Sequence, residues 1–431
     1  MSTNDVSVFE SLESEVRLYC RTFPAVFSRA KGATLRAEDG RTFIDFFCGA
    51  GTLNFGHNND VIKRRLLEYL AADGLTHGLD LYTVAKREFL ARLREVVLAP
   101  RGLDHKVQFV GPTGTDAVEA ALKLARKATG RPGIVAFSGA YHGMSRGSLS
   151  VTGSRRARAA GGSGPSAVTF VPFEDGPSGA FDSIGYLERM LADPSSGMDI
   201  PAAVIVEPLQ LEGGVYPASA PWLRALRELT TRHGILLICD EIQSGCGRTG
   251  SFFAFEHAGV EPDIVTVSKS ISGYGLPLAL VLLRRGLDVW SPGEHTGTFR
   301  GNQLAFVTAT AALELWDRAE FRAGMSAAMS ALGRFAAEPG LGVTRGRGMV
   351  LGIDLGSPLR AELVQRRCFE NGLIVELCGR EDEVVKVLPP LTIDAVTLEA
   401  GLDVLRAAVQ AAAGAGSMAA SPAAVRVAGT R

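Results

Sequence analysis

Residues 235–250 read ILLICDEIQSGCGRTG, and residues 263–269, a little further along the chain, read DIVTVSK. Each stretch contains a run of apolar and β-branched residues that leads to a charged side chain, Asp240 in the first and Lys269 in the second. A run without polar alternation is typical of a strand that is buried on both faces of a sheet. Both stretches therefore predict buried strands that deliver a charged group at their carboxyl ends.

Further runs of the same kind flank these two, and amphipathic stretches separate several of them. Strands that alternate with helices are typical of βαβ units and of a largely parallel sheet. We therefore predict an α/β fold with a mostly parallel central sheet flanked by helices. The predicted strands are Lys106–Val110, Gly133–Phe137, Ala202–Val206, Ile235–Cys239, Ile264–Val267 and Leu278–Leu283, and the predicted helices are Asp116–Ala128 and Pro221–His233.

The two ends of the chain differ in character from its middle. Thr34–Arg36 and Thr42–Phe46 flank an Asp-Gly turn signal, which predicts a hairpin. After about Phe299 the sequence becomes Ala-rich and helical, with short strands near Leu351–Asp354 and Val384–Leu388. We expect both ends together to build a smaller α+β domain beside the large one.

The predicted domain boundaries follow from these changes in character. Residues 1–65 and 321–410 are assigned to the small domain, and residues 66–320 to the large domain. Residues 411–431 are rich in Ala, Gly and Ser, and we expect a disordered tail there. Gly161–Ser166 has a similar composition, and we expect it to form a flexible loop over the site.

The composition limits the classes of protein to which the chain can belong. It has 431 residues and a formal net charge of -1, which gives no basis for binding nucleic acid or an anionic membrane. Its six cysteines include no C-x-x-C pair, which disfavours a disulfide framework or a structural zinc site. No apolar run is long enough to span a membrane. We expect a cytoplasmic protein without a metal site.

A Gly-rich turn stands between a predicted strand and a predicted helix at Gly111–Glu119, which reads GPTGTDAVE. Asp116 and Glu119 have the spacing of a capping box. Free N–H groups and the helix dipole make such a terminus an anion site, and Gly114 lets a phosphate approach the backbone. Taken alone, the turn is equally typical of an ordinary capped helix.

Asp240 and Lys269 follow apolar strands, at the edge of the sheet where ligands gather in open α/β folds. A carboxylate there needs a cation, such as a protonated pyridinium nitrogen. Burial lowers the pKa of a lysine amine, and such an amine forms and exchanges Schiff bases more readily. Taken singly, a solvent-facing helix cap would explain Asp240 and a surface loop would explain Lys269.

The three features occur in one chain order: phosphate turn, strand-end aspartate and post-strand lysine. Together they are the three anchors that pyridoxal 5′-phosphate requires. The stretch Asp240–Gly250, followed by Asp263-Ile264 and Ser268-Lys269, closely resembles class III, fold-type I aminotransferases. The resemblance extends from about Arg17 to about Leu405. It implies the fold-type I architecture, pyridoxal phosphate as cofactor and transaminase activity.

The resemblance also implies a role for individual residues. Lys269 would carry the cofactor and move the reacting proton, and Asp240 would pair with the ring nitrogen. Gly114 and Thr115 would hold the phosphate, and Tyr141 would stack on the ring. The full set of expected cofactor-binding residues is Gly114, Thr115, Tyr141, His142, Glu207, Asp240, Gln243, Lys269 and Thr298.

Thr298, in Gly297-Thr298-Phe299, resembles the residue that reaches the phosphate of the neighbouring subunit. The resemblance therefore implies a homodimer with shared active sites, which could pair into tetramers. Without the resemblance, a helix cap would be the simpler explanation of Thr298.

Substrate recognition is expected around Ala202–Gly214, which reads AAVIVEPLQLEGG. In related enzymes, the glutamate that matches Glu212 pairs with an arginine and releases it when a dicarboxylate substrate enters the site. Here Lys386 stands at that position, and a lysine lacks the bidentate geometry of arginine. Leu211 replaces the usual glycine and is expected to narrow or reshape the region beside Glu212. The expected substrate-binding residues are Asn54, Phe55, Glu212 and Lys386.

Segments outside the cofactor motifs give a closer resemblance, to the diaminobutyrate–2-oxoglutarate aminotransferases of ectoine biosynthesis. They are FESLESEVRLYC at Phe9–Cys20, FFCGAGTLNFGH at Phe46–His57, GLTHGLDLYTVAK at Gly74–Lys86, and SPGEHTGTFRGN within Leu287–Asn302. This resemblance implies transfer of an amino group from L-glutamate to L-aspartate 4-semialdehyde, with L-2,4-diaminobutyrate and 2-oxoglutarate as products. Ping-pong kinetics should follow.

Two other activities remain open from the sequence. One is a related ω-aminotransferase of antibiotic or siderophore assembly that acts on another terminal amine or aldehyde. The other is a pyridoxal-phosphate-dependent racemase or aminomutase on the same scaffold. A non-enzymatic scaffold is disfavoured because Asp240, Gln243, Lys269 and Thr298 are all present.

Overall fold

The computed structural model describes residues 5–161, 167–174, 176 and 179–418. Its largest sheet has seven strands, each a short run of mostly β-branched and apolar residues. In spatial order they are β4 (His105–Phe109), β12 (Leu280–Arg284), β11 (Ile264–Val267), β10 (Leu236–Asp240), β7 (Ala203–Val206), β5 (Ile134–Phe137) and β6 (Val168–Val171).

The sheet is parallel from β11 to β6, and only β12 runs against its neighbours. The central register pairs Asp240 of β10 with Thr266 of β11, and Cys239 with Val206 of β7. The carboxyl ends of these strands therefore meet at one edge. The predicted mostly parallel sheet is confirmed, with β6 as a strand that the sequence patterns did not reveal.

Helices cover both faces of this sheet, as the continuous apolar runs require. Ile238 of β10 packs in one cluster with residues of helix α6, whereas Leu237 and Cys239 pack in a second cluster with residues of α10. Each fully buried aliphatic side chain of this kind contributes about 1.5–3 kcal/mol to stability. Because side chains alternate along a strand, Asp240 points to the α6 side and its neighbour Glu241 to the other side.

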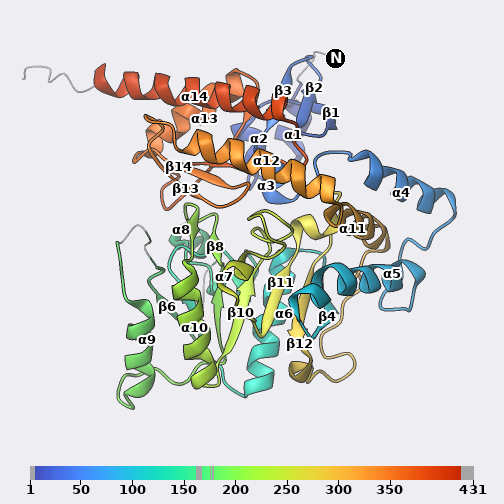
Figure 1. The fold of residues 1–431 in the computed structure, drawn as a ribbon, viewed down its shortest axis with the longest axis vertical. Coiled ribbons are helices and arrows are strands. Elements are labelled where there is room, and N and C mark those ends of the chain that lie inside the picture. The colour runs from blue at the N-terminus through green and yellow to red at the C-terminus, as the bar shows by residue number, and fades with distance from the viewer. Residues whose placement is uncertain (1–4, 162–166, 175, 177–178, 419–431) are drawn as a thin grey trace, which may run out of the picture.

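The large part of the molecule contains eight α-helices among its described residues, around the sheet in Figure 1. They are α4 (Asp60–Ala71), α5 (Val84–Leu93), α6 (Gly114–Thr129), α7 (Arg146–Ser150), α8 (Arg155–Ala160), α9 (Ser183–Ala192), α10 (Ala220–Arg232) and α11 (Gln303–Trp316). A small two-stranded ribbon joins β8 (Leu209–Gln210) to β9 (Tyr216–Pro217).

The N- and C-terminal segments lie together above the large sheet in Figure 1. One four-stranded sheet runs β1 (Phe27–Lys31), β2 (Thr34–Ala37), β3 (Thr42–Asp45) and β15 (Leu373–Ile374), and the other runs β13 (Val343–Gly346), β14 (Leu351–Asp354), β17 (Val384–Val387) and β16 (Glu376–Cys378). Pairing of β15 with β3 joins the two ends of the chain directly. The helices there are α1 (Ser7–Leu12), α2 (Tyr19–Thr22), α3 (Cys48–Gly51), α12 (Ala319–Ala336), α13 (Pro358–Glu370) and α14 (Ala395–Met418).

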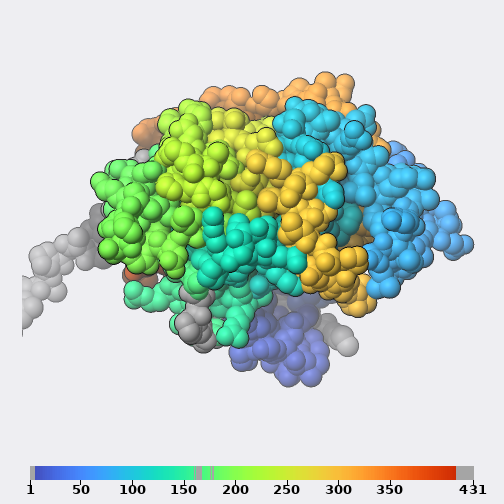
Figure 2. Space-filling model, turned by 90° about the horizontal axis from the view of Figure 1, so that it is seen from below, coloured from blue at the N-terminus to red at the C-terminus, as the bar shows by residue number. Residues whose placement is uncertain are grey.

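Seen from below, the atoms nearest the viewer belong to the green, teal, gold and light-blue segments of the large sheet and its helices (Figure 2). The orange C-terminal segments and the dark-blue N-terminal segment lie at the margins of that view. The small α+β part therefore caps one end of the sheet only. The exact division at residues 65 and 320 stays a prediction.

The predicted hairpin is confirmed, since β2 and β3 pair antiparallel. The predicted tail is corrected in part, because α14 continues through Ala411 to Met418 in one long helix. Residues 419–431 of that tail, and residues 162–166 of the predicted loop Gly161–Ser166, lie outside the described residues. Among the helices of the described chain, none is both long and apolar enough to cross a membrane.

Candidate active site

A cavity of about 270 Å³ opens at the carboxyl edge of the large sheet, and we name it the sheet-edge cavity. Its walls come from the residues that follow β4, β5, β7, β10 and β11. The lining residues are Thr113, Gly114, Thr115, Tyr141, His142, Gly143, Met144, Glu207, Asp240, Ile242, Gln243 and Lys269. The fold therefore brings eight of the nine expected cofactor-binding residues to one cavity.

Asp240 is buried at the end of β10 and is held from three sides. Its Oδ1 accepts hydrogen bonds from Thr266 Oγ1 at 2.9 Å and from the Ile242 N–H at 3.1 Å. Its Oδ2 lies 2.7 Å from His142 Nδ1. The carboxylate is thus fixed in position with its negative charge facing the cavity, where a cation is the favoured partner.

Lys269 follows β11 directly and occupies a left-handed backbone conformation, with φ of 49°. A non-glycine residue in this region carries strain of about 1–3 kcal/mol, and such residues cluster at functional sites. Its Nζ donates a hydrogen bond to the Ala50 carbonyl at 2.9 Å. Burial lowers the pKa of Lys269 below its ordinary value, although the nearby Glu212 carboxylate opposes this shift.

The N-terminus of α6 forms the opposite wall of the sheet-edge cavity. The carboxylate of Asp116 accepts hydrogen bonds from the N–H and Oγ1 of Thr113, which fixes the first turn of the helix. Thr115 Oγ1 lies 2.6 Å from Ser145 Oγ. Gly143 has φ of +123°, and a Cβ there would lie 2.6 Å from Thr115 Oγ1, so only glycine fits against this turn.

Glu207 lies behind Tyr141, and its carboxylate accepts a hydrogen bond from the Tyr141 N–H at 2.8 Å. Burial raises the pKa of Glu207 to about 7. Glu207 thus fixes the backbone of Tyr141, whose ring stands at the boundary between the sheet-edge cavity and a second one.

The second cavity is larger, at about 1310 Å³, and we name it the distal cavity. It shares Tyr141 and Lys269 with the sheet-edge cavity and is also lined by Tyr19, Glu212 and Glu376. A nucleophilic amine, an aromatic ring and two carboxylates therefore surround one space, which is accessible from outside.

Glu212 and Lys386 form an ion pair beside the distal cavity, with Nζ 2.6 Å from Oε1. The same oxygen of Glu212 accepts a hydrogen bond from Gln243 Nε2 at 2.9 Å. Burial opposes ionisation of Glu212, but the cations of Lys386 and Lys269 outweigh it and lower the pKa of its carboxyl. The lysine thus makes the contact that the resemblance assigns to an arginine.

Two residues of this cluster were missed by the sequence analysis. Glu376 Oε2 lies 3.0 Å from Lys386 Nζ, and Glu376 Oε1 accepts a hydrogen bond from the Tyr19 hydroxyl at 3.1 Å. The signal was present in Leu373–Cys378, which reads LIVELC, because a carboxylate inside an apolar run needs a buried cation. Tyr19 offered no comparable signal.

Residues 19–409 match the aminotransferase class-III family. The chain belongs to the class III aminotransferases. It is 54% identical to a diaminobutyrate–2-oxoglutarate transaminase of Nocardia farcinica, covering 95% of each chain. It is 50% identical to an enzyme of the same name from Halomonas elongata, covering 94% of this chain and 99% of that one. An uncharacterized aminotransferase of Sinorhizobium fredii is 53% identical, covering 95% and 93%.

Solved structures agree with this family. An ornithine aminotransferase from Toxoplasma gondii, described with pyridoxal phosphate at its active site, has a TM-score of 0.81 and 25% identity and covers 95% of each chain. An aminotransferase from Bacillus anthracis has a TM-score of 0.82 and 23% identity, covers 94% and 98%, and supports the fold alone. This class III aminotransferase therefore uses pyridoxal phosphate, as its family does.

The residues of the sheet-edge cavity fit this cofactor. The N-terminus of α6 is suited to a phosphate, and the fixed carboxylate of Asp240 is suited to a protonated ring nitrogen. His142 Nε2 is buried and has no hydrogen-bond partner among the described residues, which leaves a polar atom for a bound group. Lys269 is the amine in reach of both cavities.

Asn54 and Phe55 are not among the residues that line either cavity, and their expected role in substrate binding stays a prediction. Asn54 is fully buried, and its Oδ1 accepts a hydrogen bond from Arg248 Nη2. Phe55 packs in an apolar cluster and stacks on Phe321. Arg248, a fully buried cation of the DEIQSGCGRTG stretch, uses Asn54 as a polar partner.

Leu211 is also placed differently from the expectation. Its side chain is buried in an apolar cluster with Cys48, Val215 and Cys378. It does not line the distal cavity, so it does not narrow the space beside Glu212. Leu211 therefore contributes to packing, in part against Cys378, which lines the distal cavity.

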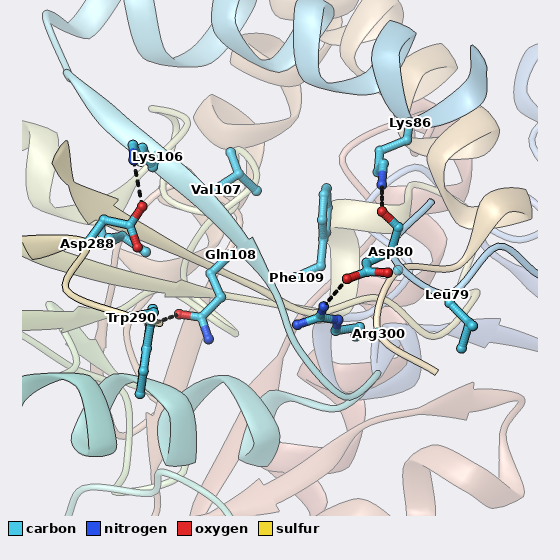
Figure 3. Close-up of a pocket in the computed structure, with 12 residues that line it drawn as sticks. Leu79, Asp80, Lys86, Lys106, Val107, Gln108, Phe109, Asp288, Trp290 and Arg300 are labelled. Atoms are coloured by element: carbon cyan, nitrogen blue, oxygen red, sulfur yellow. Dashed lines mark hydrogen bonds and ion pairs between the residues drawn. The ribbon is translucent and has the colours of Figure 1, made fainter. Parts of the chain in front are cut away.

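Thr298 is exposed and lies outside the sheet-edge cavity of its own subunit. Its loop borders a third cavity of about 270 Å³, shown in Figure 3. The polar groups drawn there bind one another: Lys106 pairs with Asp288, Trp290 with Gln108, and Arg300 with Asp80. The Lys86 amine donates a hydrogen bond to the Asp80 carbonyl, so each cation drawn there has a partner.

Proposed function

We propose that this aminotransferase transfers the amino group of L-glutamate to L-aspartate 4-semialdehyde, giving 2-oxoglutarate and L-2,4-diaminobutyrate. The observation that carries the proposal is 50–54% identity, over nearly the whole chain, to relatives named diaminobutyrate–2-oxoglutarate transaminase. The named relatives are transaminases, which favours amino transfer over racemase or aminomutase chemistry. The pathway that we propose is that of ectoine.

Bound pyridoxal phosphate supplies an electron sink and holds the amino group between the two half-reactions. In this proposal Lys269 Nζ takes the proton from the substrate carbon that bears the amino group. The low pKa of its amine favours the neutral form that can accept a proton. The hydrogen bond to Ala50 orients Nζ at the boundary of the two cavities.

In this proposal the other residues of the sheet-edge cavity hold and orient the cofactor. Gly114 and Thr115 would bind the phosphate at the N-terminus of α6, and Asp240, oriented by His142 and Thr266, would keep the ring nitrogen protonated. Tyr141, fixed by Glu207, would stack on the ring, and Gln243 would lie at its phenolic oxygen. Glu212 and Lys386 would receive the far end of the substrate.

We further propose a homodimer in which Thr298 of one subunit completes the phosphate site of the other. Supporting this, large apolar side chains are exposed beside the Thr298 loop, where a second copy would bury them. They are Leu79, Leu81, Tyr82 and Phe299. The six free cysteines are in keeping with a cytoplasmic enzyme, which we also propose.

The proposed reaction is tested with the cofactor-loaded enzyme and single amino donors. Separate incubation with L-glutamate, L-2,4-diaminobutyrate, L-ornithine and 4-aminobutyrate should convert the cofactor to its amine form, which visible absorbance reports. We expect fast conversion with the first two. Fast conversion with L-ornithine but none with L-2,4-diaminobutyrate would contradict the substrate assignment and leave the transaminase activity intact.

A further inference from the structure

Lys386 is shared by two carboxylates. Its Nζ lies 2.6 Å from Glu212 Oε1 and 3.0 Å from Glu376 Oε2. With all three groups ionised, the cluster carries two negative charges and one positive charge, and Lys269 is a second cation that acts on both carboxylates. A single carboxylate would already have neutralised the lysine, so the second one needs another explanation.

The distribution of burial shows which charges a ligand would meet. The side chain of Lys386 is 0% exposed, whereas those of Glu376 and Glu212 are 9% and 26% exposed. Glu376 and Glu212 line the distal cavity, and Lys386 lies behind them. On the side of Lys386, the distal cavity therefore presents the carboxylate oxygens of Glu212 and Glu376. The lining of the same cavity also contains Lys269 and the arginines Arg155, Arg156, Arg158 and Arg380.

Glu376 is held in a fixed orientation. It stands on β16, which pairs with β17, and Glu376 and Lys386 are direct partners in that register. The Tyr19 hydroxyl donates a hydrogen bond to Glu376 Oε1 from the opposite end of the chain. Burial raises the pKa of Glu376, and the Lys386 cation acts against that shift. A carboxylate held in this way is suited to a cationic ligand.

We propose that Glu376 binds the non-reacting ammonium group of a diamino acid substrate and so selects diamino acids over monoamines. The proposal rests on the proposed function, in which the product L-2,4-diaminobutyrate reacts at its terminal amine. Its other amine then stays charged and must lie away from Lys269, in the distal cavity. L-Glutamate has only the reacting amine and makes no such demand.

The test uses two donors that differ by one group. L-2,4-Diaminobutyrate and 4-aminobutyrate have the same terminal amine and carboxylate, and only the first has an α-ammonium group. The rate of cofactor conversion, divided by donor concentration, is measured for each donor with the wild-type holoenzyme and with Glu376→Gln. The wild type should prefer the diamino acid, and the variant should lose about 10-fold or more of that preference.

L-Glutamate distinguishes substrate selection from general damage. Conversion by L-glutamate should change less than 3-fold, a bound set well below the expected effect of about 10-fold. Glu376→Asp keeps the charge and should retain most of the preference. Glu370→Gln, the same change at an exposed position on α13, should behave as the wild type. Melting temperature and bound-cofactor absorbance report whether each variant folds.

A Glu376→Gln holoenzyme that keeps the wild-type preference would overturn the proposal. Equal losses for L-glutamate and both amine donors would also overturn it, because they would show a structural role. If the wild type does not convert L-2,4-diaminobutyrate at all, the proposed function fails first. The inference is then judged with L-ornithine and 5-aminopentanoate, which differ by the same α-ammonium group.

Discussion

The sheet-edge cavity and the distal cavity share Tyr141 and Lys269 but hold their charges in different ways. In the sheet-edge cavity, Asp240 stands at the end of a strand, and its carboxylate is held by His142, Thr266 and the Ile242 N–H. In the distal cavity, Glu212 and Glu376 close on a buried lysine. One cavity is therefore prepared for a cation, and the other has its cation already in place.

The difference teaches how one amine can serve two kinds of ligand. The sheet-edge groups are fixed by strand register and need not move, which suits a cofactor that stays bound. Of the distal groups, Tyr19, Glu376 and Lys386 come from the terminal segments and Glu212 from the loop between β8 and β9. The distal cavity is also larger, which suits substrates that enter and leave in turn. Lys269 lines both the sheet-edge cavity and the distal cavity, so it can contact a bound cofactor and an entering substrate.

The largest expected effect comes from removing the residue that both cavities share. Lys269→Ala should lower turnover by roughly 10^4-fold, because the variant would lose the amine that we propose as both the cofactor-binding group and the proton acceptor. Steady-state transamination measures the loss, while circular dichroism and sedimentation report the fold and the oligomer. Turnover near that of the wild type would show that another residue has the role proposed for Lys269.

A smaller loss of turnover is expected when the negative charge of Asp240 is removed from the sheet-edge cavity. Asp240→Asn keeps the shape but removes the charge that would face the ring nitrogen, and should lower kcat by roughly 10^2–10^3-fold. Glu241→Gln is the matched control, because Glu241 directly follows β10 and does not line the sheet-edge cavity. Its carboxylate accepts hydrogen bonds from Ser244 Oγ at 2.7 Å and Phe255 N at 2.9 Å, away from the cavity. Equal losses in both variants would contradict a specific role for Asp240.

The contrast between the cavities also explains how much the sequence could predict. The strand ends that carry Asp240 and Lys269 were predictable, because an apolar run and the polar residue after it are neighbours in the chain. The pair of Tyr19 and Glu376 joins residues 357 positions apart, and no local pattern encodes that contact. The residues of the sheet-edge cavity can thus largely be predicted from local sequence patterns, whereas the contacts of the distal cavity depend on the tertiary structure.

The positions of Asn54 and Leu211 have a physical cause of the same kind. Asn54 was expected at the substrate entrance, but Arg248 is fully buried and needs acceptors, which Asn54 and the Met349 and Pro389 carbonyls provide. Burial of a cation depends on the whole fold and cannot be read from the motif that contains it. Leu211 was judged by its neighbour Glu212, although side chains next to each other in sequence can point to opposite sides.

Changes to the cluster of Lys386, Glu212 and Glu376 should alter the free energy of unfolding. Lys386→Met leaves Glu212 and Glu376 without their cation, and should lower the free energy of unfolding by about 4 kcal/mol, as breaking a buried ion pair does. Urea denaturation at pH 7.5 measures the change. The triple variant that adds Glu212→Gln and Glu376→Gln should recover most of it, since no buried charge is then unpaired. Failure of the triple variant to recover would show that Lys386 acts through packing alone.

The smallest effect separates charges that serve chemistry from charges that serve the fold. Burial raises the pKa of Glu241 to about 7, so the folded state keeps its proton where the unfolded state has lost it. Its contribution to stability is therefore full below the unfolded pKa of 4.5 and is lost as pH rises to about 7. Glu241→Gln, which stays neutral, should gain roughly 2–3 kcal/mol relative to the wild type over this range, at about 1.4 kcal/mol per pKa unit. Denaturation midpoints at pH 5, 6, 7 and 8 test the slope. A constant difference across this series would mean that Glu241 ionises in the folded state as it does in water, and the assignment of a neutral buried carboxyl beside the charged Asp240 would fail.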